Sequence, residues 1–399
     1  MTLVAIETLV LIALIGVVSP LLSEISGPLA IPEIVFQIGL GILIGPFVLN
    51  IAHLDSVITG LSDLGLSYLI FLAGYELNID RIRGKPVRLA ALGWAISLAI
   101  GFFAAFALVS SGLARDTIVV GLALTTTALA TLMPVLRDAG VTPTPFGSYI
   151  EAIGTLGEFG PIVAVALLLT RKDPVLTSLL LVAFVVVAVV TIVMATRTHP
   201  PRLVRMLSRH LESSAQLPVR LSLLLIVLLV LLADKLGLDV LLGAFAAGIV
   251  VKRFTTGDDS DLVKAKLEAI GFGFLIPIFF VVSGITFDLH VFLNHPAELW
   301  RVPFFLVLML VARGVPVVLL YRNVLTRRQL APMALFSATG LPLIVVITSI
   351  ALSERRILEV NAASLVAAGL LSVMIFPASG IVLLRRIRGQ PAAAAPADS

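Results

Sequence analysis

The sequence contains no cysteine and little charge. Without cysteine there can be no disulfide, no thiol catalysis and no cysteine-ligated metal. Only 13% of the 399 residues are charged, and the five histidines are scattered without the spacing of metal ligands. No nucleophile motif, metal site or phosphate-binding loop is recognisable, so we expect neither an enzyme nor a bound cofactor.

Hydrophobic sequence fills nearly the whole chain instead. Hydrophobic residues make up 59% of it, and the mean hydropathy is +1.11, far above the range of soluble domains. Many apolar runs are close to the ~20 residues that a helix needs to cross a bilayer. The first run, from about Leu3, has no basic start and no small-residue cleavage site, so we expect a mature helix rather than a signal peptide. These features predict an all-α polytopic membrane protein that binds no nucleic acid and lies in a lipid bilayer.

Thirteen predicted transmembrane helices account for the apolar runs. Charged residues or turns rich in glycine and proline separate them. The predicted segments lie near residues 3–22, 30–50, 57–78, 88–110, 116–136, 147–170, 175–195, 218–234, 238–251, 267–287, 299–321, 330–352 and 361–384.

The distribution of basic residues predicts the orientation. An odd number of crossings puts the two termini on opposite sides of the membrane. Of the 28 lysine and arginine residues, 20 fall on the side of the C-terminus, 7 fall on the other side, and Arg313 lies inside a segment. Because basic loops stay cytoplasmic, we expect an integral plasma-membrane protein with the N-terminus outside and the C-terminus in the cytoplasm.

Two halves of opposite orientation are also predicted. The longest polar linker, 196–218, follows the seventh segment and leaves six helices on each side of one connecting helix. The fifth helix of each half, GLALTTTALATLMPVL at 121–136 and LFSATGLPLIVVI at 335–347, combines threonine, serine and small residues with a proline. Matched broken helices are typical of inverted-repeat transporters, although such residues also allow close helix packing.

Two charged residues fall near the middle of predicted membrane segments. They are Glu158 and Arg313. An ionised side chain there costs roughly 2.5–3.5 kcal/mol, so both are expected to face protein or a water-filled cavity. We interpret Glu158 as a site that binds a proton or a monovalent cation, and Arg313 as either a structural counter-ion or a partner in the mechanism. Glu151, two helical turns or about 10 Å earlier, is either an entrance residue or simply solvated.

Four stretches resemble a known family. They are PEIVFQIGLGILIGP (32–46), LIFLAGYELNIDRIR (69–83), TTTALATLMPVLRDAG (125–140) and PIFFVVSGITFDL (277–289). They are similar to the monovalent cation:proton antiporter-2 family, the sodium/proton exchanger-like group with a Kef-type membrane domain. The resemblance implies a sodium/proton antiporter fold over residues 1–388, with segments 5 and 12 crossing as broken helices beside the ion site. It also implies a homodimer, with a dimerisation part built from segments 1–3 and 8–10 and a core part built from segments 4–6 and 11–13.

The same resemblance implies the site residues. In that family, segment 6 usually carries Asp-Asp or Asn-Asp, and the second aspartate binds ion and proton. Here the matching positions are Gly157 and Glu158, so the carboxylate is kept and its polar neighbour is missing. One carboxylate favours one proton per cation, an electroneutral exchange. Arg313 matches the basic core residue, and the oxygen donors expected nearest the ion are Thr126, Thr127, Thr131, Ser337 and Thr339.

The end of the chain is expected to be a short disordered tail. Residues 389–399 read GQPAAAAPADS, a composition that cannot form a core. Many members of the family carry a cytosolic nucleotide-binding domain, and none is recognised here. The prediction therefore includes no regulatory domain and leaves any regulatory subunit unidentified.

The predicted function is secondary active exchange of Na⁺ or K⁺ for protons by alternating access. No metal is expected beyond the transported cation. One alternative is a gated potassium efflux channel, but no glycine-rich segment resembles a selectivity filter. Another alternative is an inactive or sensor homologue, because Gly157 stands where the family usually has a polar residue.

Overall fold

The computed structural model describes residues 3–26, 31–76, 84–168, 216–236, 240–254, 260–294 and 296–388. Helices are the only regular structure in these ranges. Seven described helical stretches, some of which join several of the elements named below, are long and apolar enough to cross a membrane by length and composition. The prediction of an all-α polytopic protein is confirmed. The total of thirteen helices stays a prediction, because the segment near 175–195 lies outside the described residues, as does the tail at 389–399.

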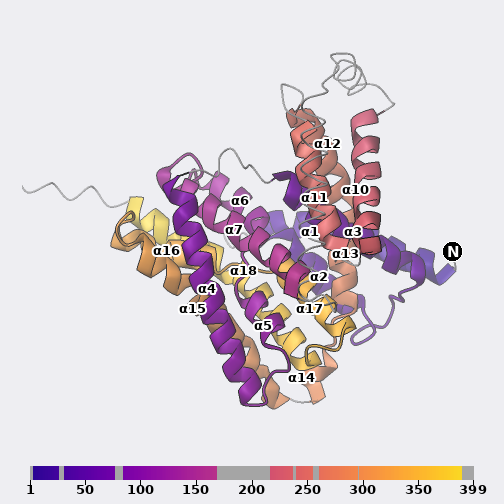
Figure 1. Ribbon diagram of the computed structural model, residues 1–399. Coiled ribbons are helices and arrows are strands. Elements are labelled where there is room, and N and C mark those ends of the chain that lie inside the picture. The colour runs from indigo at the N-terminus through magenta and orange to yellow at the C-terminus, as the bar shows by residue number, and fades with distance from the viewer. Residues whose placement is uncertain are drawn as a thin grey trace, which may run out of the picture. The chain divides into compact units, whose positions relative to one another are not determined.

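The chain divides into two compact units. Unit 1 comprises residues 1–23, 36–79 and 162–289, and unit 2 comprises residues 24–35, 80–161 and 290–399. Figure 1 labels the elements of both units. The described helices of unit 1 are most of α1 (Leu3–Ile25), most of α2 (Glu33–Ile44), α3 (Ser56–Glu76), α10 (Leu217–Leu236), α11 (Val240–Phe254), α12 (Ser260–Ile270), the π-helix η2 (Gly271–Leu275) and α13 (Ile276–Ile285).

Unit 1 is held together by very close contact between helices. A Cβ atom added at Gly74 of α3 would lie 2.1 Å from the carbonyl oxygen of Phe245 in α11, and one added at Gly248 of α11 would lie 2.1 Å from the carbonyl oxygen of Phe71. Both positions therefore need glycine, as expected where the backbones of two membrane helices touch. The hydroxyl of buried Tyr68 donates to the carbonyl oxygen of Leu267 over 3.1 Å.

Unit 2 contains the helices in which we predicted the ion site. They are α4 (Lys85–Ser110), α5 (Thr117–Leu124), α6 (Leu129–Asp138), most of α7 (Pro145–Leu168), α14 (His290–Asn294), the 3₁₀ helix η3 (Pro296–Trp300), α15 (Arg301–Tyr321), α16 (Arg327–Ser337), α17 (Pro342–Ser353) and α18 (Glu359–Arg388). Helix α15 packs on α4, α16 and α18. A core cluster that includes Leu136, Phe146 and Phe336 joins α6, α7 and α16.

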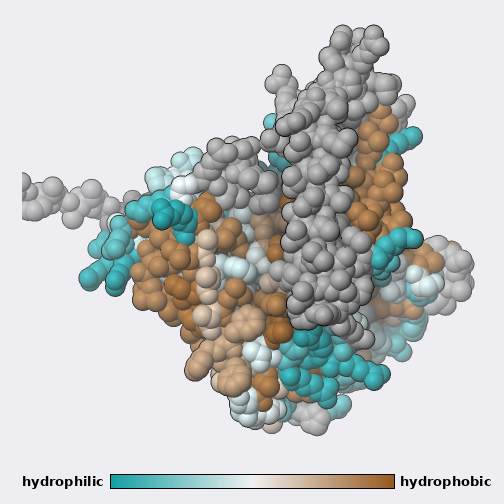
Figure 2. All heavy atoms as spheres, in the orientation of Figure 1, coloured by the Kyte–Doolittle hydropathy of each residue, from teal (hydrophilic) through white to brown (hydrophobic). Residues whose placement is uncertain are grey.

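The outer surface of unit 2 is suited to lipid. In the view of Figure 2 the surface over α4 and α15 is mostly apolar, and hydrophilic residues gather near α14 and near α16. The exposed large side chains on these two helices include Leu92, Phe103, Phe106, Val307 and Val318. An apolar band between polar ends is the pattern of a membrane-spanning surface.

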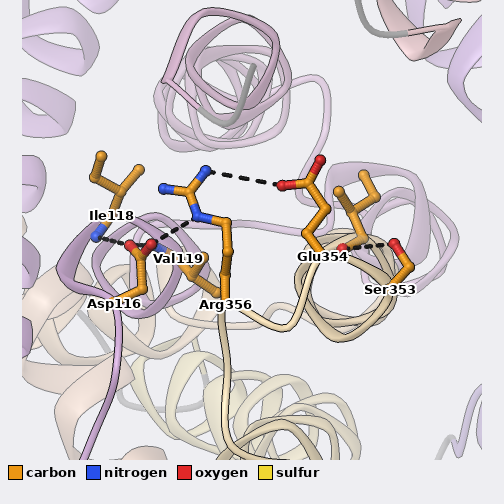
Figure 3. Close-up of polar contacts among 7 residues, drawn as sticks. Asp116, Ile118, Val119, Ser353, Glu354 and Arg356 are labelled. Atoms are coloured by element: carbon orange, nitrogen blue, oxygen red, sulfur yellow. Dashed lines mark hydrogen bonds and ion pairs between the residues drawn. The ribbon is translucent and has the colours of Figure 1, made fainter. Parts of the chain in front are cut away.

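An ion pair links the ends of two half-helices in unit 2. Asp116 caps the start of α5, because one carboxylate oxygen accepts the backbone N–H groups of Ile118 and Val119 over 2.8 and 3.1 Å. Its other oxygen accepts from Nε of Arg356 over 2.7 Å. Arg356 follows the end of α17, and Figure 3 shows its guanidinium between Asp116 and Glu354, whose carboxylate lies 3.9 Å away. One aspartate therefore both starts α5 and ties it to the chain after α17.

Replacing Asp116 by alanine is expected to destabilise unit 2. Loss of the cap costs about 1 kcal/mol, and loss of the partly exposed ion pair adds about 0.5 kcal/mol. Asp116→Asn keeps a capping oxygen and loses only the charge, so its effect should be smaller. Thermal unfolding of the purified protein in detergent measures both variants. Equal loss of stability in the two variants would contradict a capping role.

Candidate functional site

The first helix break lies between α5 and α6, at residues 125–128. Two of its threonines donate side-chain hydrogen bonds to carbonyl oxygens of the preceding helical turn. The hydroxyl of Thr125 donates to the carbonyl oxygen of Leu122 over 2.9 Å, and that of Thr126 donates to the carbonyl oxygen of Ala123 over 3.0 Å. Such bonds compete with continuation of the helix. Helix α6 then starts at Leu129 without a side-chain cap.

The second break lies between α16 and α17, at residues 338–341. Helix α17 begins at Pro342. Proline has no N–H to donate to the previous turn and disfavours helical geometry in the residue before it, which explains the interruption. Helix α17 also lacks a side-chain cap. Both predicted broken helices are therefore present, and each exposes an uncapped N-terminus inside the protein.

The two breaks are bonded to each other. The backbone N–H of Ala128 in the first break donates to the carbonyl oxygen of Thr339 in the second over 2.7 Å. The hydroxyl of Thr127 donates to the carbonyl oxygen of Ser337, the last residue of α16, over 2.6 Å. Half-helix ends carry partial charges, positive at N-termini and negative at C-termini. Their meeting gives unit 2 a polar centre among apolar helices.

Arg313 lies buried at this centre and holds it together. Its Nε donates to the hydroxyl of Thr127 over 3.0 Å and to the carbonyl oxygen of Ser337 over 3.2 Å. Its Nη2 donates to Thr127 over 2.7 Å and to the carbonyl oxygen of Ile153 over 3.2 Å, and its Nη1 donates to the hydroxyl of Ser97 over 3.3 Å. All these acceptors are neutral oxygens. A charged donor gains roughly 1.5–3 kcal/mol per bond, which offsets part of the cost of burial.

Gly157 of α7 contacts both Arg313 and Thr127 of this centre. Its carbonyl oxygen accepts the backbone N–H of Thr127 over 2.8 Å. A Cβ atom at this position would lie 2.5 Å from Nη2 of Arg313 and 2.5 Å from the hydroxyl oxygen of Thr127. The space that any side chain would need is therefore occupied by the guanidinium. This contact is the physical reason why the position tolerates glycine and excludes larger residues in this arrangement.

The two candidate carboxylates lie on α7. Glu158 directly follows Gly157, whose carbonyl oxygen accepts the N–H of Thr127 in the first break. Glu151 lies seven residues earlier, about two turns away on the same helix face. Both glutamates are partly exposed in the structure. Neither is among the hydrogen-bond partners of Arg313, which are Ser97, Thr127, Ile153 and Ser337.

The remaining predicted oxygen donors also lie at or near the breaks. Thr126 is buried, and its hydroxyl oxygen would lie 2.7 Å from a Cβ atom added at Gly340 of the second break. The hydroxyl of Thr339 donates to the carbonyl oxygen of Leu335 over 3.1 Å. The hydroxyl of Thr131, in the first turn of α6, is buried and bonds no other residue that the structure describes.

Sequence reasoning missed two hydroxyls that support the centre. Ser372 of α18 accepts the N–H of Gly340 over 3.1 Å and lies within 3.1 Å of the carbonyl oxygen of the same residue. Ser97 of α4 accepts from Arg313. Each lies in a mostly apolar helix that contains at least one other serine, and nothing in the sequence distinguishes it from a serine that only allows close packing.

Gly157→Ala is expected to disrupt the centre, because the added methyl group would displace Arg313 or Thr127. Overpacking of this kind costs about 1–3 kcal/mol. The matched control is Gly39→Ala in α2, where an added Cβ atom meets nothing within 4 Å. Thermal unfolding should show a lowered midpoint for Gly157→Ala only. If both variants unfold like the wild type, the packing of Arg313 against Gly157 is wrong.

The described residues hold no group of three or more histidine, aspartate or glutamate side chains that could bind a metal ion. The oxygen groups that the structure places at the centre are serine and threonine hydroxyls and backbone carbonyls. Oxygen donors of this kind bind monovalent cations, and a lone carboxylate also binds a proton. Uncapped half-helices at a bilayer midplane are typical of ion sites in transporters.

Comparison with known proteins shows similarity over most of the chain. Residues 10–386 match the transmembrane sodium/hydrogen exchanger family. The chain is 30% identical over 289 residues to the Na⁺/H⁺-K⁺ antiporter GerN of Bacillus cereus, covering 69% of this chain and 71% of GerN. It is 26% identical over 332 residues to YjbQ of Bacillus subtilis, covering 79% of this chain but only 53% of YjbQ, so it spans about half the length of that relative.

A solved structure shares the fold. The sodium proton antiporter MjNhaP1 from Methanocaldococcus jannaschii, at pH 8, aligns with a TM-score of 0.66 and 19% sequence identity, covering 97% of this chain and all of that one. The antiporter fold expected from the sequence is therefore confirmed, while the Kef-type detail stays a prediction. The family consists of secondary transporters rather than enzymes. On the match over nearly its whole length, this chain belongs to the sodium/hydrogen exchanger family.

Proposed function

We propose that the protein exchanges a monovalent cation, Na⁺ or K⁺, for a proton by alternating access, with Glu158 as the carboxylate that both ions share. The observation that carries the proposal is the bond between the α7 backbone and the first helix break. The carbonyl oxygen of Gly157 accepts the N–H of Thr127, and Glu158 is the next residue. A membrane carboxylate beside two uncapped half-helices has the chemistry to bind either ion.

Sharing one carboxylate is sufficient for obligatory exchange. A proton and a cation neutralise the same negative charge, so only one of them is bound at a time. The neutralised site crosses the low-dielectric interior at a lower cost than the bare carboxylate, because burial of an unpaired charge is strongly unfavourable. If the site changes sides only when it is neutralised, one proton crosses in the opposite direction for each cation that crosses the membrane. We therefore propose electroneutral exchange.

Arg313 is proposed to act as the fixed cation of the site. Its charge lies near the C-terminal end of α16, where it donates to the carbonyl oxygen of Ser337. That position is favourable for a cation. Thr126, Thr127, Thr131, Ser337 and Thr339 are the proposed sources of oxygen ligands, and Glu151 is a proposed entrance residue.

The remaining architecture is proposed from the family. It is a homodimer in the plasma membrane with a cytoplasmic C-terminus, in which predicted segments 1–3 and 8–10 form the dimerisation part and segments 4–6 and 11–13 form the moving core. The name of GerN includes both Na⁺ and K⁺. Both cations are therefore substrates to test.

The proposal is tested with purified protein in liposomes that hold a proton gradient and a pH-sensitive dye. Addition of Na⁺ or K⁺ should dissipate the gradient, and clamping the voltage with an ionophore should leave the rate unchanged. If neither cation moves protons and neither cation crosses the membrane, the inactive-homologue interpretation is correct. Cation flux without proton movement would instead indicate a channel.

A further inference from the structure

A small cavity lies against Arg313. Its walls come from α4, α7 and α15, all within unit 2, and include Trp94, Ser97, Arg313 and Tyr321. Its volume is about 10 Å³. That is space for about one water molecule and excludes organic ligands. The rest of the wall is mostly apolar.

Two residues of this wall each have a buried polar atom that bonds no other residue that the structure describes. These atoms are Nε1 of Trp94 and the hydroxyl oxygen of Tyr321. Tyr321 has only 1% of its surface exposed, so bulk water does not satisfy its hydroxyl. Buried polar groups almost always have a hydrogen-bond partner, and those without one usually indicate a bound water or ion. Two such groups around one cavity point to the same occupant.

The bonding needs of the wall define the chemistry of that occupant. Nη1 of Arg313 has two N–H groups, and Ser97 is its one acceptor among the described residues. The Ser97 hydroxyl already donates to the carbonyl oxygen of Gly93 over 2.9 Å, so it offers no proton. The indole of Trp94 can only donate, whereas the hydroxyl of Tyr321 can donate or accept. The occupant must therefore accept hydrogen bonds, and the positive guanidinium disfavours a cation.

We propose that this cavity is a binding site for one water molecule that joins Arg313, Trp94 and Tyr321. The water accepts from the guanidinium and from the indole N–H, and it donates to the hydroxyl of Tyr321. Through this water, the hydrogen bonds of Arg313 connect the helix breaks to Tyr321, the last residue of α15. The site does not depend on the proposed function, because it follows from the cavity and from the unpaired donors around it.

Thermal unfolding of Tyr321→Phe in detergent tests the site, because the variant removes one oxygen and keeps the ring. The matched control is Tyr68→Phe, since Tyr68 is equally buried and its hydroxyl has a protein acceptor. We expect both variants to unfold several degrees below the wild type. A hydroxyl without a bound water makes no bond, so an unchanged or raised midpoint for Tyr321→Phe alone would overturn the proposal.

Replacing chloride by gluconate tests whether the occupant is an anion. We expect the unfolding midpoint of the wild type to be the same in both salts. A midpoint that rises with chloride in the wild type but not in Tyr321→Phe would assign the cavity to a halide and overturn the water assignment.

A high-resolution map gives the direct result. Density within hydrogen-bond distance of both Nε1 of Trp94 and the Tyr321 hydroxyl is expected, and an empty cavity beside other well-ordered buried waters would contradict the site.

Discussion

Glu158→Gln is expected to abolish cation-driven proton movement and to leave the protein folded. Glutamine keeps the size and an oxygen of the side chain, but it carries no negative charge and does not titrate. Because the proposed exchange needs one group that binds either a proton or a cation, the variant should lose both half-reactions together. In the liposome assay its rate should fall to that of protein-free vesicles, while its thermal unfolding midpoint stays at or above that of the wild type.

Glu151→Gln is the control for this experiment. It makes the same chemical change on the same helix, seven residues away from the residue that follows Gly157. We expect it to retain most of the transport rate, with at most a weaker apparent affinity for the cation. Normal exchange by Glu158→Gln, or equal loss in the two variants, would show that the titrating group lies elsewhere.

Arg313→Lys is expected to have the second largest effect, although it keeps the charge. The guanidinium bonds Thr127 through two nitrogens and also reaches the carbonyl oxygens of Ser337 and Ile153. A lysine ammonium is a single nitrogen without this fork, so at least two of these bonds are lost. The free energy of unfolding should fall by about 3 kcal/mol, and transport per folded molecule should fall strongly.

Arg301→Lys separates the loss of stability from the loss of transport. Arg301 is a second buried arginine of the same helix, and its Nη1 donates to the side-chain oxygen of Asn361 and to the carbonyl oxygen of Leu113, both over 2.7 Å. We expect this variant to lose stability as well and to keep its transport rate per folded molecule. If Arg313→Lys transports normally, the guanidinium contributes only to the fold.

The helix breaks were predictable from the sequence for a local reason. Pro342 cannot continue a helix, and the threonines at 125–127 bond back to the preceding turn, so both interruptions are encoded within a few residues. The apolar runs predicted most helices in the same way. The bounds of α12, η2 and α13 were not predicted, because Ser260–Ile285 is one continuous run of three helical elements of which only the later part is strongly apolar.

The site was only partly predictable, because its decisive contacts join residues far apart in sequence. The sequence singled out Glu158, Arg313 and the threonines as polar residues in apolar helices. It did not show that the partners of Arg313 are neutral oxygens, two of them backbone carbonyls, which belong to every residue alike. Gly157 illustrates the same limit. In the sequence, glycine stands where the family usually has a polar residue. In the structure, the guanidinium of Arg313 occupies the space that a side chain at this position would need.

The pH dependence of the apparent KM for the cation tests the shared carboxylate most directly. If proton and cation compete for Glu158, acidification should raise the KM for Na⁺ or K⁺ by up to about tenfold per pH unit, because each unit is a tenfold change in the competing ion. The maximal rate should stay constant across that range. A KM that stays constant while the maximal rate falls would mean that the two ions bind at separate groups, and would contradict the account.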